Sequence, residues 1–164
     1  LMTPYAANRR SMSNSTLFDE NTVNWKPLPG PDGSPADHIG MSILNVDEKA
    51  KIVDVLFKFE ANKKILWHKH TSDFNTFVVK GEHRIYSLEG ELREVRPAGT
   101  FKASPASEEP HTEGGGDEDV VILFSLRPYD AEKPIYEILD TNHEVVATMT
   151  FDAMKDLYQA SEAA

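Results

Sequence analysis

The chain of 164 residues contains no cysteine. This absence excludes disulfides, thiolate metal sites and cysteine nucleophiles, so any metal ion must be held by His, Asp, Glu or Asn side chains. The chain also lacks an apolar run approaching the roughly 18 residues of a membrane-spanning helix. Residues 1–16 lack the apolar core of a signal peptide. We therefore expect a cytoplasmic protein with no membrane partner.

Basic residues are scarce. The formal net charge is -10, with 17 Lys and Arg against 27 Asp and Glu, and no stretch offers the basic face of a nucleic-acid binder. We therefore expect no nucleic-acid partner. The densest acidic run, over residues 108–119, has two interpretations. It is either a solvated loop or a rim that repels anionic ligands from a nearby cavity.

Length and composition are those of one globular domain with its own core. We expect residues 1–16 to form an N-terminal arm and residues 17–164 to form a single domain. Residues 24–37 carry four prolines and two glycines. Because proline lacks a backbone donor and glycine loosens the chain, this composition predicts an entry loop without regular structure.

From residue 39 to residue 150, short strand patterns alternate with turn signals. The predicted strands cover residues 53–59, 65–70, 76–80, 84–88, 92–96, 120–126, 135–139 and 145–149. Only the tail has a helical pattern, which Asp152 is predicted to cap. The fold class is therefore all-β, a barrel or sandwich with a short C-terminal helix, and a jelly roll is among the expected forms.

Two histidines have the spacing of metal ligands on a strand. His68 and His70 lie two positions apart, so their side chains project from the same face of the predicted strand. Neutral imidazole is also the commonest protein ligand for transition metals. The pair taken alone is equally consistent with two partly exposed histidines on a strand face.

The surrounding residues resemble the two motifs of the cupin superfamily. The first motif is matched by His68, His70 and Gly81. The second is matched by Gly99, Pro105 and His111, with one extra residue before the histidine. The resemblance covers about residues 52–126. It implies a cupin jelly-roll barrel in which His68, His70 and His111 bind one divalent metal ion.

Three positions depart from these motifs. Asn62 and Ser107 replace motif glycines, and Asn75 stands where many cupins have a metal-binding glutamate. An amide is a poor metal ligand, so a site of three histidines would leave about three octahedral positions open. Such a site favours an anionic chelate such as an enolate. It resembles the iron centre of the acetylacetone-cleaving and dihydroxyacetophenone dioxygenase cupins.

This resemblance implies an enzyme that uses Fe(II) and dioxygen to cleave a carbon–carbon bond of a small β-diketone or hydroxy-ketone. One alternative is a non-oxidative zinc or nickel cupin that acts as an isomerase, cyclase or hydrolase. Another is a ligand-sensing cupin module without activity. We also expect a homodimer, because cupin barrels often pair through edge strands, and residues 1–16 and 135–149 are the candidate contacts.

Three further residues are catalytic candidates. Glu113 shares the strand face of His111 and is interpreted as a fourth ligand, an acceptor for an imidazole N–H, or a solvated loop acid. Arg84 and Tyr86 alternate along one side of a strand. On the cavity side, Arg84 would hold an anionic oxygen and Tyr86 would donate a hydrogen bond.

The remaining predictions depend on which strand face points inward. Asn75, Phe77 and Val79 share one face and are expected to line the substrate pocket. A slip of one residue would turn all three outward. The predicted core includes Phe57, Phe101 and Phe124. The predicted surface or turn histidines are His38, His83 and His143, and of these His83 has the best claim to a role in the site.

Overall fold

The structure is a computed structural model that describes residues 18–163. A short 3-10 turn, η1 (Glu20–Thr22), precedes the strands, and one helix, α2 (Phe151–Glu162), follows them. The strands are β1 (Lys26–Pro29), β2 (Pro35–Asp47), β3 (Ile52–Phe59), β4 (His68–His70), β5 (Asp73–Lys80), β6 (Glu82–Tyr86), β7 (Leu92–Pro97), β8 (Phe101–Ser104), β9 (Thr112–Gly115), β10 (Val120–Arg127), β11 (Pro134–Leu139) and β12 (Val145–Thr150).

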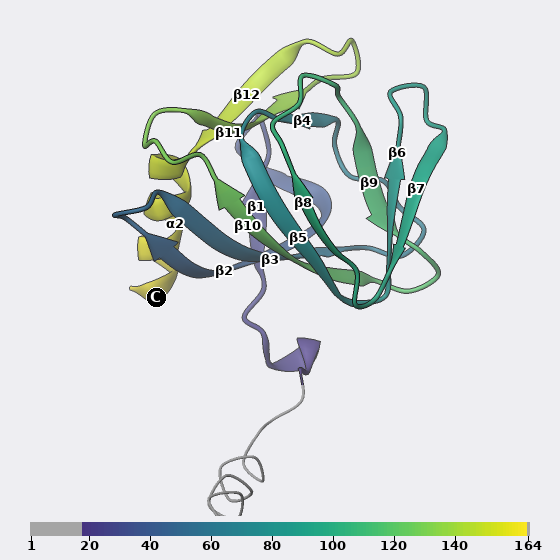
Figure 1. Cartoon of the computed structure of the whole chain (residues 1–164), viewed down its shortest axis with the longest axis horizontal. Coiled ribbons are helices and arrows are strands. Elements are labelled where there is room, and N and C mark those ends of the chain that lie inside the picture. The colour runs from purple at the N-terminus through teal and green to yellow at the C-terminus, as the bar shows by residue number, and fades with distance from the viewer. Residues whose placement is uncertain (1–17, 164) are drawn as a thin grey trace, which may run out of the picture.

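Three antiparallel sheets curve around a common interior, as Figure 1 shows. The largest has the strand order β1-β2-β3-β10-β5-β8, and the two smaller ones have the orders β12-β11-β4 and β7-β6-β9. An isolated bridge between His68 and His111 joins β4 to the chain just before β9. Among residues 18–163, no helix has the length and apolarity to cross a membrane.

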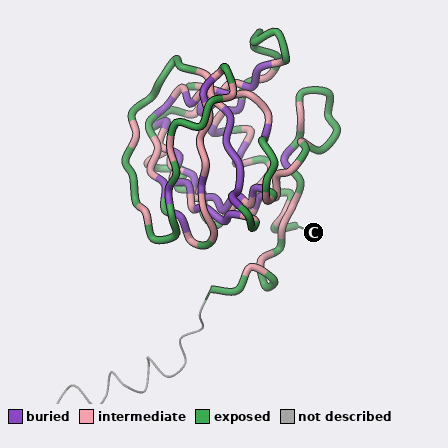
Figure 2. The backbone as a smooth tube through the Cα atoms, turned by 90° about the vertical axis from the view of Figure 1, so that its right-hand side faces the viewer, coloured by how far each residue is buried: buried purple, intermediate pink, exposed green. Residues whose placement is uncertain are grey.

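The core follows from strands whose alternate residues are apolar. In β3, Val53, Val55, Phe57 and Phe59 are all buried, and in β10 Val120, Ile122, Phe124 and Leu126 are buried opposite them. Successive side chains of a strand point to opposite faces, so this period of two turns one continuous apolar surface inward. Figure 2 shows the buried backbone concentrated in the middle of the barrel and the exposed backbone in its turns.

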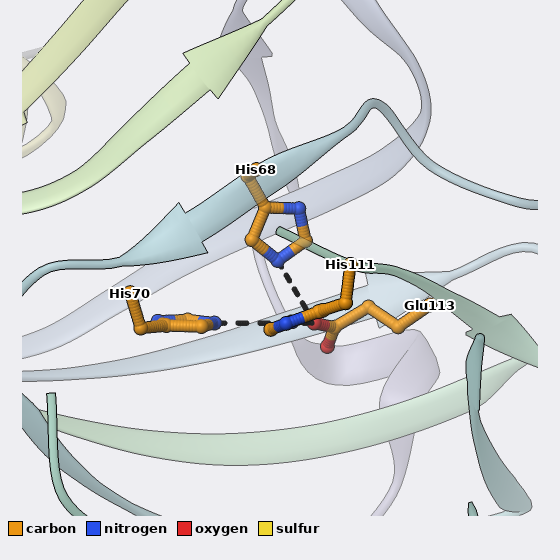
Figure 3. Close-up of side chains that lie close together, drawn as sticks. All are labelled: His68, His70, His111 and Glu113. Carbon is orange, nitrogen blue, oxygen red and sulfur yellow. Dashed lines mark hydrogen bonds and ion pairs between the residues drawn. The ribbon is translucent and has the colours of Figure 1, made fainter. Parts of the chain in front are cut away.

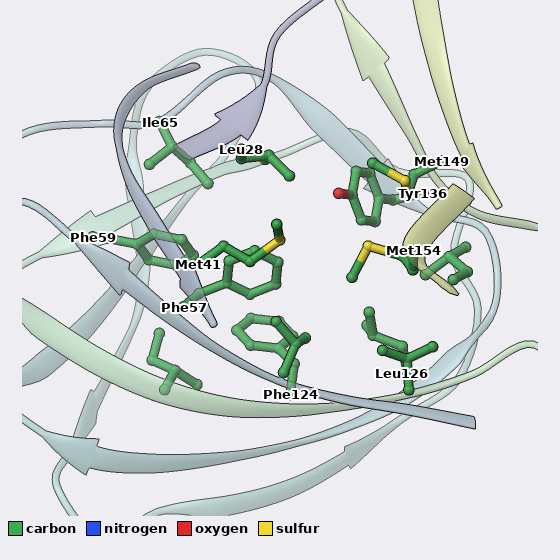
Figure 4. Packing of buried hydrophobic residues seen from close by; sticks show 14 of the residues in the cluster. Leu28, Met41, Phe57, Phe59, Ile65, Phe124, Leu126, Tyr136, Met149 and Met154 are labelled. Carbon is green, nitrogen blue, oxygen red and sulfur yellow. The ribbon is translucent and has the colours of Figure 1, made fainter. Parts of the chain in front are cut away.

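Aromatic rings pack across these two central strands. The rings of Phe57 and Phe124 meet edge to face with centroids 5.3 Å apart, and Phe57 stacks on Phe59 at 5.9 Å. Both arrangements are favourable for aromatic pairs. Figure 4 shows Met41 beside the Phe57 ring, Met149 beside Tyr136, and Met154 extending from α2 into the core.

The structure corrects three sequence predictions. The predicted entry loop contains β1 and the start of β2. Pro27 and Pro29 are tolerated because β1 is an edge strand that need not donate on its outer side. The helix is capped by Thr150, whose hydroxyl accepts a hydrogen bond from the Ala153 amide at 3.2 Å, and not by Asp152. Phe101 is 63% exposed on the edge strand β8 and lies outside the core. The predicted arm, residues 1–16, lies outside the described range.

Candidate metal centre

Strand β4 carries His68 and His70 into the barrel. Both side chains are buried, as expected for residues two positions apart on one strand face. Pairing with β11 fixes their depth, since His68 lies opposite Ile138 and His70 lies opposite Tyr136. The ring of His70 also stacks on Phe74 of β5, with centroids 4.0 Å apart.

The third histidine reaches the same point through the backbone. The amide of His68 donates to the carbonyl of His111 at 3.0 Å, and the amide of His111 donates back at 2.9 Å. Residues paired in this way place their side chains on one face of the sheet. The centroid of the His111 ring lies 4.5 Å from that of the His68 ring and 5.2 Å from that of the His70 ring. Figure 3 shows the three rings converging.

Glu113 completes the cluster. It follows His111 by two residues, and its side chain is only 3% exposed. Its Oε2 atom lies 2.9 Å from Nε2 of both His68 and His111, and 3.9 Å from Nε2 of His70. The interpretation of Glu113 as a solvated loop acid is therefore wrong, because the glycine run beside it is largely the buried strand β9.

A glycine explains how β9 lies so deep. A Cβ atom on Gly114 would stand 1.8 Å from the carbonyl oxygen of Lys63, a separation that no side chain tolerates. Only glycine lets the segment leading to β4 cross this strand so closely. The crossing is held by a hydrogen bond from the Ile65 amide to the Glu113 carbonyl at 2.9 Å. The fold therefore sets the backbone of Glu113 as well as its side chain.

A fourth histidine holds the other carboxylate oxygen. Nε2 of His83 lies 2.9 Å from Oε1 of Glu113, and the His83 side chain is 2% exposed. The prediction of His83 as a surface or turn residue is wrong. The sequence did indicate this position, because His83 projects from the face of β6 opposite to that of Arg84 and Tyr86. With those two residues facing outward, His83 faces the interior.

Burial and hydrogen bonding together set the protonation states of the cluster. Burial opposes ionisation of Glu113, but hydrogen bonds from the surrounding imidazoles outweigh it and hold the Glu113 pKa well below its usual range. Burial lowers the pKa of His70 to about 4 and, with the nearby His68, also lowers the pKa of His111. Burial acts the same way on His68, but the hydrogen bond to Glu113 prevails and raises its pKa.

These groups fit a metal ion. One ligand atom from each of His68, His70, His111 and Glu113 lies within 4.8 Å of all the others. Two atoms bound at about 2.1 Å to an octahedral ion are about 3.0 Å apart when adjacent and about 4.2 Å apart when opposite. The spacing of 2.9 Å is close to the adjacent distance, and the spacing of 3.9 Å lies between the two. The donor set of imidazole and carboxylate suits iron, zinc or nickel.

The tautomer of His68 also favours metal binding. Its Nδ1 atom lies 2.9 Å from the carbonyl oxygen of Leu66. A carbonyl can only accept, so Nδ1 carries a proton. Loss of the proton on Nε2, which faces the cluster, would make Nε2 the nitrogen available to a metal. Metal-binding histidines commonly have such a backbone partner, because it fixes both the tautomer and the orientation of the ring.

An apolar cavity of about 30 Å³ adjoins the cluster. On this measure a water molecule needs roughly 10–15 Å³, so the cavity is about the size of two waters. Its polar lining residues are His68, His70, Glu113 and Tyr136. The rest of its wall is apolar and consists of Leu28, Ile39, Phe57, Phe59, Ile65, Leu66, Phe124 and Leu126.

Two predicted catalytic residues do not reach this cavity. On β6, the Arg84 side chain turns away from the cluster, and its Nε atom donates to Glu82 at 2.6 Å. The ring of Tyr86 lies beneath the Lys64 ammonium group, 4.3 Å from the ring centroid. Neither residue lines the cavity, because His83 occupies the inward face of this strand.

The residues of β5 that face the interior are one position away from the predicted pocket residues. Phe77 is 40% exposed, and neither Asn75 nor Val79 lines the cavity. The inward face belongs instead to Phe74, Thr76 and Val78. The pocket prediction placed the wrong face of β5 inward, because both faces of this strand carry apolar residues. His38 and His143 lie near the surface as predicted.

Comparisons with known proteins identify the fold. No protein-family model matches the chain, and no curated protein matches it by sequence. A solved RmlC-like cupin protein from Ralstonia eutropha is 20% identical, with a TM-score of 0.66 over 92% of this chain and 89% of that one. An acetylacetone dioxygenase from Acinetobacter johnsonii is 17% identical, with a TM-score of 0.58 over 90% of this chain and 91% of its own.

A third solved structure, from Methylibium petroleiphilum, is provisionally described as an acetylacetone dioxygenase. It is 15% identical, with a TM-score of 0.61 over 88% of this chain and 97% of its own. At these identities the likenesses establish architecture. They confirm the predicted cupin β-barrel with a short C-terminal helix, and the resemblance to acetylacetone dioxygenase-like cupins holds at the level of fold.

Proposed function

Because the chain has the cupin fold, we propose that it is a metal-dependent enzyme whose ion is held by His68, His70 and His111 together with Glu113. One observation carries this proposal: Nε2 atoms from three histidines approach a single buried carboxylate oxygen at 2.9, 2.9 and 3.9 Å. A buried carboxylate is costly unless it is paired. The imidazoles pair Glu113 here, and a divalent ion held by the same atoms would pair it as well.

We propose Fe(II) as the ion and oxidative cleavage of a carbon–carbon bond in a small β-diketone or hydroxy-ketone as the reaction. The acetylacetone dioxygenase among the structural neighbours supports this choice. Bound iron would supply the activation of dioxygen and of the substrate enolate. The protein would supply the dry apolar cavity beside His70, which orients the substrate and excludes water.

The inclusion of Glu113 changes the site expected from the motifs. Four protein ligands leave about two octahedral positions open, where three histidines would leave about three. Those two positions would take either a bidentate chelate or one substrate oxygen together with dioxygen. The charge of Glu113 also offsets part of the ion's charge, so a singly charged chelate such as an enolate would neutralise the site. The cavity of about 30 Å³ is smaller than acetylacetone, so binding even the smallest members of this substrate class would require its apolar wall to open.

The second candidate is a non-oxidative zinc or nickel enzyme. The buried carboxylate supports it, since catalytic zinc sites commonly combine histidines with a glutamate and keep a position for water. In that case the metal-bound water would be the reactant, and the activity would not depend on dioxygen.

The test is metal analysis combined with oxygen uptake. We expect the purified protein to contain one iron per chain and to consume dioxygen with acetylacetone. His70→Ala should lose both properties. His143→Ala, which removes an exposed histidine outside the cluster, should keep both. Zinc or nickel at full occupancy, together with no oxygen uptake after iron loading, would favour the second candidate.

The homodimer and the cytoplasmic location remain predictions. The oligomeric state is measured by light scattering of the purified protein, and a mass near twice 18.4 kDa is the expected result. Val145 and Val146 on β12, within the predicted contact region, are both exposed. Exposed apolar residues on such an edge strand support a pairing surface.

A further inference from the structure

Tyr136 is a buried residue that the metal cluster does not use. It lies on β11 with 6% of its surface exposed, and its hydroxyl oxygen has no hydrogen-bond partner within residues 18–163. Buried hydroxyl groups are nearly always paired, because an unpaired one loses its hydration without compensation. A partner for this hydroxyl is therefore expected from outside the described residues.

The position of Tyr136 shows where such a partner would lie. Tyr136 is the cross-strand neighbour of His70, and the two rings are 6.4 Å apart between centroids. Both side chains line the same cavity, and Figure 4 shows the tyrosine hydroxyl pointing into the barrel interior. Tyr136 therefore lies beside the cavity that adjoins the metal cluster.

The protonation state of Tyr136 suits a hydrogen-bond donor. A phenol hydroxyl carries its proton at neutral pH and offers one O–H donor. The other polar side chains lining the cavity, His68, His70 and Glu113, belong to the metal cluster. Tyr136 is thus the cavity residue outside the cluster that offers a proton to an oxygen atom.

We propose that Tyr136 donates a hydrogen bond to an oxygen atom of the metal-bound substrate. The substrate class that fits is a small molecule with an apolar body and anionic chelating oxygens at one end. The apolar wall at Leu28, Phe57 and Leu126 receives the body, while the oxygens lie between His70 and Tyr136. This inference rests on the proposed metal-dependent function and deepens it. It gives Tyr136 the donor role that the sequence suggested for Tyr86.

The test compares ligand binding to the iron-loaded protein without dioxygen, with acetylacetone as the probe. Tyr136→Phe removes only the hydroxyl oxygen and keeps the ring. We expect it to weaken acetylacetone binding about 10- to 100-fold in an optical or calorimetric titration, as for loss of a hydrogen bond to a charged oxygen. Iron content and iron affinity should not change, because Tyr136 is not a ligand.

Tyr86→Phe is the matched control, since that ring lies outside the cavity beneath Lys64. It should bind acetylacetone as the wild type does. Equal affinity in Tyr136→Phe and wild type would overturn the role of Tyr136 and leave the proposed function intact. If iron-loaded wild type does not bind acetylacetone, the proposed function fails and this inference fails with it. Thermal unfolding of Tyr136→Phe without ligand checks that the variant is folded.

Discussion

His68 and His111 form a reciprocal pair in which each backbone amide donates to the other's carbonyl, at 3.0 and 2.9 Å. This pair is an isolated bridge between two of the three sheets. The same two hydrogen bonds join β4 to the chain just before β9 and bring the two imidazole rings to 4.5 Å. The metal cluster is thus supported by backbone pairing, which holds its ligands more rigidly than loop side chains would be held.

Replacing Glu113 with glutamine should weaken metal binding. The variant keeps the shape of the side chain but loses the charge that a dication requires. We expect metal affinity to fall at least 10- to 100-fold, the range seen when a supporting partner of a metal ligand is lost. A competition titration with a chelating dye measures it. Glu108→Gln, which changes an exposed acid paired with Lys69, is the control. Unchanged affinity in Glu113→Gln would show that Glu113 is not a ligand.

His83 should act on the metal through Glu113. Its Nε2 atom holds Oε1 at 2.9 Å, which directs Oε2 toward the three other histidines. His83→Leu frees Oε1 to rotate, so we expect a metal affinity about 10- to 100-fold lower. The absorption spectrum of the cobalt-loaded protein should also change. His83→Gln can still donate to Oε1 and should restore part of both properties. A cobalt spectrum identical in all three proteins would contradict this positioning role.

The metal-free protein should lose stability on mild acidification. The pKa of His70 is about 4 in the native state, against 6.5 for a free histidine. Between these values the unfolded chain binds more protons than the native state, so the free energy of unfolding increases with pH across this window. Glu113 acts in the same direction, since its pKa is lowered as well.

The measurement is urea unfolding in the presence of a chelator at several pH values from 4 to 6.5. His70→Asn should show a shallower dependence of the unfolding free energy on pH than wild type. His143→Asn, which alters an exposed histidine, should follow the wild type. An equally steep dependence in His70→Asn would rule out His70 as the source.

Gly114→Ala should distort the metal site without touching a ligand. The added Cβ would meet the Lys63 carbonyl oxygen at 1.8 Å, so β9 or the segment before β4 must move. We expect a loss of about 1–3 kcal/mol in unfolding free energy, as for other overpacked sites, and a lower metal content. Gly40→Ala is the control, because its nearest neighbour would be 3.5 Å away. A variant with wild-type stability and metal content would refute the close crossing.

Sequence patterns were sufficient for the architecture and for the three histidines. Alternating apolar residues over 53–59 predicted β3, and the apolar run over 120–126 predicted β10. The two-residue spacing of His68 and His70 predicted a shared strand face. These predictions succeeded because the period of a strand is a local property that each segment carries by itself.

The residues around the histidines were decided by tertiary structure. On β5 and β6 both faces carry residues suited to a cavity, so the local pattern did not tell which face turns inward, and the pocket prediction chose the wrong one. Glu113 beside a glycine run has the composition of a loop, yet the crossing at Lys63 buries it. The sequence showed which residues of β4 share a face and which residues of β6 do. Folding brings distant segments side by side and so decides which residues lie opposite each strand. Those contacts make His83 and Tyr136 part of the site.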